Sequence, residues 1–311
     1  MENVEPIADG GGNDYHVPVL YQECLDALDI RADGTYVDCT FGGGGHSRGI
    51  LDLLDGNGRL FAFDQDADAK VNLPDDPRVT FIPQNFRHIQ RFLRLHHAGQ
   101  VDGILADLGV SSYQFDTAER GFSTRFDAEL DMRMDQKQGK TAGTVLATYS
   151  EAKLHKMFEQ YGEVTNAKTL ARTIAEQREI KPFRTISEFR QAISPVVKGN
   201  PNKYLAQVFQ AIRIEVNEEM EALAEMLQQA ALCVKPGGRL AIISFHSLED
   251  RLVKNFIRYG QADEPETDDV YGTRPSSPWK AVHKKPLTAS AAELKRNPRS
   301  RSAKLRVAEK I

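Results

Sequence analysis

The chain has 311 residues and a hydrophobic content of 41%, so it can bury a full core in one large or two modest domains. Its longest apolar stretches, such as 240–245, are far too short to cross a bilayer, and its acidic, glycine-rich N-terminus does not resemble a signal peptide. Three widely spaced cysteines, Cys24, Cys39 and Cys233, form no CxxC pair, which indicates neither a zinc site nor a disulfide framework. We therefore expect a cytoplasmic protein that makes no contact with a membrane.

The first part of the chain alternates between apolar runs and helical segments. A tail at 1–14 is expected to be flexible. Short β-rich runs follow at 35–41, 59–66, 79–86 and 101–111. Helices are expected between them, at 47–54 and 86–96. Strands that alternate with helices indicate parallel βαβ units and therefore a doubly wound, Rossmann-like sheet.

The alternation stops after Ser112, where apolar positions recur at helical spacing. Helices are expected at 151–158, 167–180, 186–197 and 205–232. The βα pattern then returns with a turn at 235–238, a strand at 239–246, a helix at 248–259 and β-like runs at 279–282 and 303–308. The sequence thus predicts an α/β core formed by 15–115 and 214–311, interrupted by a helical insertion at 116–213.

The net charge of −4 hides a strong asymmetry along the chain. Residues 280–311 hold ten lysines and arginines against two glutamates, a net charge of +8, and the insertion carries +4, so the remainder carries −16. A basic tail on an acidic body fits contact with a polyanion at one face. A solvated, partly disordered C-terminus explains the same charges equally well.

A glycine-rich segment, DCTFGGGGHS at 38–47, lies where the first strand turns into the first helix. Glycines there let the backbone approach a ligand, and a helix N-terminus offers unpaired N–H groups. Asp64 ends the next strand, where a carboxylate can accept both hydroxyls of a ribose. These two features fit NAD or S-adenosylmethionine.

Three details favour S-adenosylmethionine. The strict G-x-G-x-x-G pattern is missing, because Ser47 stands where the third glycine would fall when counting from Gly42. Asp38 would repel a pyrophosphate but could pair with a methionine amino group, directly or through water. The Lys-Pro-Gly-Gly turn and the closing pair of β-runs resemble the seven-stranded sheet of class I methyltransferases.

The run ADLGVSS, from 106 to 112, brings polar groups to the carboxyl edge of the sheet, where such folds bind ligands. Asp107 could accept a hydrogen bond from an exocyclic amine and so favour its attack, contact the cofactor, or merely cap the next turn. The three cysteines lie in the glycine turn or on apolar helices and are interpreted as buried thiols. Nitrogen is therefore favoured over carbon as the methyl acceptor.

A second polar cluster follows the late strand, in the run SFHSLEDR from 244 to 251. Glu249 and Asp250 are interpreted as acids in the first turn of a helix capped by Ser247. His246 is the better candidate for contact with a target base or phosphate, although a lone histidine is more often structural.

Together these motifs resemble the bacterial small-subunit ribosomal RNA cytosine-N4 methyltransferases of the MraW type. The resemblance covers almost the whole chain beyond Tyr15. It is carried by HVPVL at 16–20, TFGGGGHS at 40–47, DLGVSS at 107–112, ERGFS at 119–123, LDMRMD at 130–135, SFHSLEDR at 244–251 and NPRSRSAKLR at 297–306. It implies methylation of the exocyclic nitrogen of a cytosine in the decoding region of the small subunit, by a Rossmann-like core whose helical insertion engages the substrate.

The resemblance also implies a set of site residues. Contacts to S-adenosylmethionine would come from Gly44, Gly45, His46, Asp64, Phe86, Asp107 and Gln114. With the residues read from the sequence alone, Asp107, Ser111 and His246 form the expected catalytic group. The chain departs from the family pattern mainly at 261–278, an acidic loop that looks short, which leaves any substrate contact there in doubt.

Two other functions stay open at this point. A DNA amino-methyltransferase would typically carry a proline-rich acceptor motif where this chain has Asp-Leu-Gly-Val-Ser. A non-catalytic RNA-binding assembly factor would not need the glycine turn with Asp64 and Asp107. The expected partner is small-subunit ribosomal RNA or a ribosomal particle, and the sequence leaves open whether the protein is a monomer or a homodimer.

Overall fold

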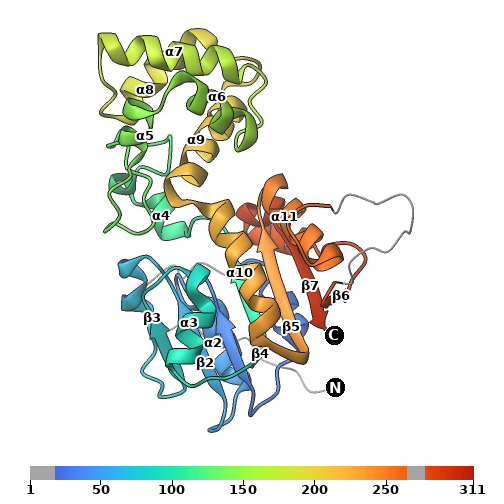
Figure 1. Ribbon diagram of the computed structural model, residues 1–311. Coiled ribbons are helices and arrows are strands. Elements are labelled where there is room, and N and C mark those ends of the chain that lie inside the picture. Colours follow the sequence, from blue (N-terminus) through green and yellow to red (C-terminus); the bar gives the residue numbers. More distant parts are fainter. Residues whose placement is uncertain (1–17, 265–276) are drawn as a thin grey trace, which may run out of the picture.

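The computed structural model describes residues 18–264 and 277–311 and contains one seven-stranded sheet (Figure 1). Its strands are β1 (Thr35–Asp38), β2 (Arg59–Phe63), β3 (Val79–Ile82), β4 (Val101–Asp107), β5 (Val234–Ser244), β6 (Trp279–Ala281) and β7 (Lys304–Lys310). The order is β3-β2-β1-β4-β5-β7-β6, in which the first five strands are parallel and β7 runs antiparallel to both of its neighbours. The predicted α/β fold of a class I methyltransferase is confirmed.

Helices cover both faces of the sheet. On one face lie α3 (Ile89–Leu95), α10 (Glu219–Cys233) and α11 (Ser247–Tyr259), and on the other lie α1 (Tyr21–Leu28) and α2 (Gly45–Leu53). Successive side chains of a strand point to opposite faces, so Val37 and Ile104 pack in the first core while Tyr36 and Leu105 pack in the second. Both faces are therefore apolar, as expected for a parallel sheet.

The strands β1 to β4 each end three or four residues earlier than predicted. The expected helix at 86–96 is a 3-10 turn, η2 (Phe86–His88), followed by α3. Further 3-10 turns are η1 (Ala67–Asn72), η3 (Ala118–Arg120), η4 (Ser194–Val196) and η5 (Pro298–Ser302). Three short helices were not predicted from the sequence: α4 (Ser112–Asp116), α5 (Ala142–Thr148) and α12 (Ala291–Arg296).

A group of helices lies beyond one end of the sheet in Figure 1. It comprises α5, α6 (Glu151–Gln160), α7 (Ala167–Ile180), α8 (Ile186–Ile193) and α9 (Pro201–Asn217). These helices share a hydrophobic core of their own, whose residues come from between Phe122 and Val216. The insertion boundaries expected at 116–213, and the role in substrate recognition, remain predictions.

The single helix expected at 205–232 is wrong, because α9 and α10 meet at a break. Glu218 has a left-handed backbone, with φ of 51°, which ends the first helix. Its carboxylate pairs with Arg87 at 2.8 Å and Lys140 at 3.3 Å. The neighbouring Asn217 side chain accepts a hydrogen bond from the N–H of Met134 and donates one to the carbonyl of Met132. These tertiary contacts hold a bend that helical periodicity cannot predict.

No helix in the described ranges is long and apolar enough to span a membrane. The tail at 1–14 and most of the acidic loop at 261–278 lie outside the described residues.

Candidate functional site

A cavity of about 1150 Å³ opens at the carboxyl edge of the sheet. Its walls come from the glycine turn, the ends of β2 and β4, the start of α10, α4, and the segment that joins α12 to η5. Ligand pockets commonly measure roughly 300–1000 Å³, so this cavity has room for more than one small molecule. It lies where open α/β sheets place their ligands.

The glycine turn exposes backbone to this cavity. Gly42 adopts a φ of 50°, and a Cβ added at Gly43 would meet no atom within 4 Å. At Gly45, by contrast, a Cβ would lie 2.3 Å from Cγ of Pro18. Gly42, Gly43 and Gly45 line the cavity, whereas Gly44 does not. Of the two glycines that the resemblance implies, Gly45 therefore lies on the cavity wall and Gly44 does not, while the approach of the backbone to a ligand stays a prediction.

Asp38 does not line the cavity, in contrast to its suggested pairing with a methionine amino group. Its side chain is buried and tied at both oxygens. Oδ1 accepts the N–H of Thr40 at 3.0 Å, and Oδ2 accepts the hydroxyl of Ser47 at 2.7 Å. Asp38 thus holds the start and the end of the glycine turn together.

Asp64 lies at the end of β2, as predicted, and lines the cavity. Its carboxylate accepts the N–H of Gly42 at 2.7 Å and the N–H of Asp66 at 2.8 Å. Burial, opposed by these two hydrogen bonds, raises the pKa of Asp64 to about 6. The group fixes the glycine turn and keeps lone pairs for a further donor, such as a hydroxyl.

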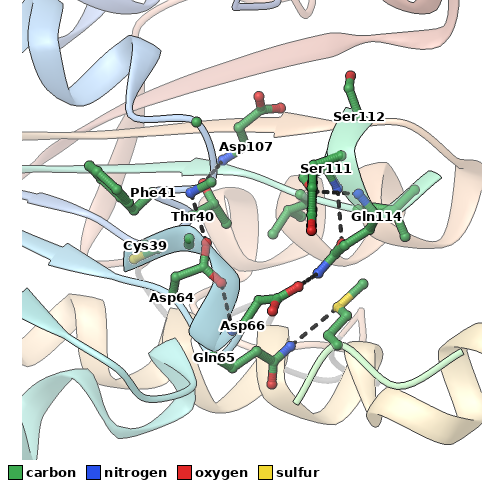
Figure 2. A pocket seen from close by; sticks show the side chains of 18 of the residues that line it. Cys39, Thr40, Phe41, Asp64, Gln65, Asp66, Asp107, Ser111, Ser112 and Gln114 are labelled. Carbon is green, nitrogen blue, oxygen red and sulfur yellow. Dashed lines mark hydrogen bonds between the residues drawn. The ribbon is translucent and has the colours of Figure 1, made fainter. Parts of the chain in front are cut away.

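Gln114 is buried on α4 and joins two parts of the cavity wall (Figure 2). Its Nε2 donates to Asp66 at 2.7 Å, and its Oε1 accepts the N–H of Ser111 at 3.1 Å. Ser111 in turn caps α4 by accepting the N–H of Gln114. The two predicted residues, Ser111 and Gln114, therefore form one capping box that faces the cavity.

Asp107 lies on the cavity wall at the end of β4, and its N–H donates to the hydroxyl of Thr40 (Figure 2). Its Oδ2 is 3.9 Å from Nδ1 of His46, while its Oδ1 is buried and has no hydrogen-bond partner among the described residues. Burial, with the neighbouring carboxylates of Asp38 and Glu249, raises the pKa of Asp107 to about 8. A buried acceptor without a donor is costly, which indicates a place for a ligand N–H.

His46 and Phe86 are also on the cavity wall. The His46 ring is buried at the start of α2, with Nε2 3.1 Å from the carbonyl of Val19. Phe86 begins η2 and is half-buried. It packs against the core that lies between the sheet and the helices α3, α10 and α11. Phe86 therefore offers a ring surface on the side of the cavity nearest β2 and β3.

His246 is not among the residues that line the cavity. It caps α11, its side chain is 8% exposed, and its Nε2 lies 3.1 Å from Oε1 of Glu249. The structure thus does not bring His246 into the group with Asp107 and Ser111 that the sequence predicted. The His246 ring contacts Glu249, and the two residues share the capping box at the start of α11.

Glu249 is a cavity residue that the sequence reasoning did not assign to the site. It was interpreted as a first-turn acid, and it does accept the backbone N–H groups of Phe245 and His246. It is also 2% exposed and lines the cavity. Burial raises its pKa, but the His246 contact and the Phe245 hydrogen bond outweigh this effect, and the pKa of Glu249 lies below its usual range. The local sequence pattern indicates only that Glu249 lies in the first turn of a helix, and it does not show that its side chain also lines the cavity.

Glu249, His246 and Glu219 bring ligand-type atoms within 4.8 Å of one another. Glu219 already receives two hydrogen bonds from the guanidinium of Arg213, at 2.8 and 3.0 Å. A cation placed there would therefore be repelled by a fixed positive charge.

The segment between β4 and α5 joins the cavity to the helical group through Arg120. The buried Arg120 guanidinium pairs with Asp66 at 2.7 Å and donates to the carbonyls of Arg133 and Met134. Met134 and Asn217 then complete the cavity wall on this side. The motifs at 119–123 and 130–135 therefore have a structural reason, because they anchor the loop that closes the cavity.

The three cysteines are buried, as predicted. Burial raises the pKa of the Cys24 and Cys39 thiols well above the ordinary value, and that of Cys233 to about 11. Cys39 lines the cavity, but a thiol of raised pKa carries little thiolate at neutral pH and is a weak nucleophile.

The comparison of whole sequences decides the family. The profile of the MraW methylase family matches residues 13–311. The chain belongs to the MraW methylase family. Ribosomal RNA small subunit methyltransferase H of Bacteroides fragilis is 53% identical over 297 residues, which cover 95% of this chain and 97% of that protein. The protein of the same name from Flavobacterium johnsoniae is 54% identical over 299 residues, which cover 96% and 98%.

Among solved structures, this MraW-family chain is similar to an rRNA methylase from Streptococcus thermophilus, with a TM-score of 0.39 and 12% identity. That alignment covers 92% of this chain and 93% of the other.

Proposed function

We propose that this protein transfers a methyl group from S-adenosylmethionine to the exocyclic N4 amine of a cytosine in the decoding region of small-subunit ribosomal RNA. Family membership and the names of its relatives support the enzyme class and the substrate. The observation that carries the chemistry is the buried, unpartnered Oδ1 of Asp107 on the wall of a cavity of about 1150 Å³.

The cavity wall fits S-adenosylmethionine. The open backbone at Gly42 and Gly43 would receive the methionine end, together with Gly45 and His46. Asp64 would accept the ribose hydroxyls, since it ends β2 and retains free lone pairs. The Phe86 ring would lie along the adenine. When bound, the cofactor supplies a methyl group activated by a positively charged sulfur.

The acceptor side of the cavity suits an amine. The N4 lone pair of cytosine is delocalised into the ring, so the amine attacks well only when acceptors hold its N–H groups and align it with the methyl group. Asp107 Oδ1 offers such an acceptor, and Oδ2, which lies 3.9 Å from Nδ1 of His46, would face the methionine end. Ser111 lies on the same wall and orders α4 beside it.

Carbon methylation of the cytosine ring is the poorer fit. That reaction needs a thiolate nucleophile, and burial raises the pKa of all three cysteines. Nitrogen methylation needs only acceptors and alignment, which Asp107 and the cavity shape supply.

The helical insertion at 116–213 is proposed to bind the RNA substrate. Its net charge is +4, against an acidic remainder of the core, and Arg120 ties its first loop to the cavity. We propose that the reaction takes place in the cytoplasm, because ribosomal particles are found there.

Label transfer tests the proposal against its two alternatives. The protein is incubated with methyl-labelled S-adenosylmethionine and either undermethylated small ribosomal subunits or duplex DNA, and cofactor binding is measured by calorimetry. We expect cofactor binding and label in the ribosomal RNA alone. Label in DNA would support a DNA amino-methyltransferase, and RNA binding without cofactor binding would support a non-catalytic assembly factor.

A further inference from the structure

An exposed aromatic ring stands at the mouth of the cavity. Tyr113, on α4, is 59% exposed and lines the cavity. The next residue, Gln114, is buried in the wall, so Tyr113 is held on a helix that is fixed at its start by the Ser111 capping box. A large exposed aromatic side chain at a binding cavity is the usual platform on which an unpaired base stacks.

Arginines border the same mouth from a distant part of the sequence. Arg296 ends α12 and Arg299 lies in η5, and both line the cavity. Arg299 donates twice to Asp116 of α4, at 2.9 and 2.7 Å, so the two segments are joined directly. Arg125 pairs with the same carboxylate at 2.6 Å.

This arrangement orders the cluster and leaves it positive. The guanidinium groups of Arg125 and Arg299 lie 5.1 and 5.6 Å from the ring centre of Phe115. Arg125, Arg296 and Arg299 against Asp116 give this cluster a net charge of +2. Arg296 forms no ion pair within the described parts of the chain and is exposed, so its guanidinium is available to an anion.

We infer that this rim, formed by Tyr113, Arg296 and Arg299, binds the nucleotide adjacent to the target in single-stranded RNA. Tyr113 stacks on the neighbouring base, and Arg296 binds its phosphate while Arg299 keeps α4 in position. The inference rests on the proposed function, since it names the part of the RNA that enters with the target. It explains how a cytosine removed from its stack is held while its amine reaches Asp107.

Substitutions at Tyr113 test the stacking contact. Tyr113→Leu should raise the Kd of a labelled single-stranded, cytosine-containing RNA, measured by fluorescence anisotropy, by about 5- to 100-fold. It should raise the KM for small ribosomal subunits similarly. Tyr113→Phe keeps the ring and should stay within about twofold of wild type. The Kd of S-adenosylmethionine should not change in either variant, and thermal unfolding confirms that both are folded.

A matched pair of charge changes tests the phosphate contact. Arg296→Gln should reduce the slope of log Kd for RNA against log salt by about one. Lys295→Gln removes the same charge from the preceding, exposed position, which does not line the cavity, and should change the slope less. Equal changes in slope would mean that the tail attracts RNA only through its overall charge and would overturn the assignment of Arg296.

The outcomes separate the rim from the proposed function. Wild-type methyl transfer with an unchanged KM in Tyr113→Leu would overturn the rim alone. Loss of S-adenosylmethionine affinity in Tyr113→Leu would also overturn it, because the ring would then belong to the cofactor site. RNA binding that depends on Tyr113, without any methyl transfer by wild type, would support the rim and contradict the proposed function.

Discussion

The backbone N–H of Gly42 donates to Oδ2 of Asp64 at 2.7 Å, which joins the glycine turn after β1 to the end of β2. The other oxygen of Asp64 accepts the N–H of Asp66. One carboxylate therefore sets the shape of two loops that form the cavity wall. Any change at Asp64 acts on this shape as well as on a bound ligand.

Substitution of Asp64 should separate these two effects. Asp64→Asn keeps an acceptor for one backbone N–H but removes the charge, and it should weaken S-adenosylmethionine binding by about 10- to 100-fold, since charge-assisted hydrogen bonds contribute about 1.5–3 kcal/mol. Isothermal calorimetry measures the Kd of S-adenosylmethionine for the variant and for wild type. An unchanged Kd in a folded Asp64→Asn variant would exclude contact between Asp64 and the cofactor.

Asp64→Ala should do more damage than the sequence alone suggests. A role in ribose binding alone would predict weaker cofactor binding without unfolding, but the structure shows that two backbone N–H groups would lose their acceptor. Each unsatisfied buried group costs about 1–3 kcal/mol. Denaturant unfolding should therefore show a clear loss of stability in Asp64→Ala and a smaller one in Asp64→Asn.

A pair of alanine substitutions in the glycine turn should have opposite consequences. Gly45→Ala places a Cβ 2.3 Å from Cγ of Pro18, so it should lower the free energy of unfolding by about 1–3 kcal/mol. Gly43→Ala meets no protein atom and should leave stability unchanged, but its methyl group occupies cavity space and should weaken cofactor binding by about tenfold. Thermal unfolding and calorimetry on both variants provide the comparison, and equal cofactor affinity in Gly43→Ala and wild type would contradict the proposed approach of the methionine end.

Asp107 should make stability depend on pH in the cofactor-free protein. Its pKa is raised to about 8 by burial and by the nearby carboxylates of Asp38 and Glu249, above its ordinary value of 3.8. The stability that it contributes is therefore full below about pH 4 and is lost as the pH rises toward 8. Asp107→Asn cannot ionise, so it should gain stability over wild type between pH 5 and 8, by up to about 1 kcal/mol per pH unit.

Denaturant unfolding of wild type and Asp107→Asn at pH 5, 6, 7 and 8 checks this expectation. A difference in free energy that does not vary with pH would show that Asp107 is already ionised throughout the range. The same variant removes the charge and replaces one of the two acceptor oxygens with an N–H donor, so it should lose methyl transfer by about 100-fold or more.

The predicted RNA contacts of the insertion need revision. Arg125, Arg133 and Lys137 are three of the basic residues that give the insertion its net charge of +4. Arg133, however, forms paired hydrogen bonds with Asp131 and donates to two loop carbonyls, so reversing it would disrupt the loop itself. Lys137 is exposed and is the better choice.

Lys137→Glu should reduce ribosomal RNA methylation at physiological salt and flatten its inhibition by salt, because fewer phosphates are neutralised, while cofactor affinity stays constant. Lys137→Gln should give a smaller loss, because it removes one charge rather than reversing it. Wild-type methylation by Lys137→Glu would indicate that RNA approaches the protein without this part of the insertion.

The sequence predicted those features that depend on local pattern. The parallel strands follow from apolar runs, and β7 from the alternation of Ala303–Ala308. Asp64 and Asp107 could be located because each lies at the end of a strand that an apolar run predicts, and Gln114 and Phe86 only through the family resemblance. The residue at the end of a strand can be identified from the local pattern, whereas the contacts of a loop depend on parts of the chain that are distant in sequence.

The misses share that cause. Glu249 was expected only as an acid in the first turn of a helix and His246 as a ligand contact, because only the packing of α11 shows which of the two side chains faces the cavity. The tail was expected to attract RNA by charge or to form a strand. Lys304–Lys310 does form a strand, and Arg299 binds Asp116, a contact across 183 positions that no local pattern could reveal.

The identity of the methylated nucleoside tests the central claim most directly. Undermethylated small ribosomal subunits are incubated with the wild-type protein and methyl-labelled S-adenosylmethionine, and the RNA is digested to nucleosides for mass spectrometry. We expect the label in N4-methylcytidine, with Asp107→Asn as the inactive control. Label in 5-methylcytidine or in another nucleoside, or no label from a preparation that binds the cofactor, would contradict methyl transfer to the exocyclic amine.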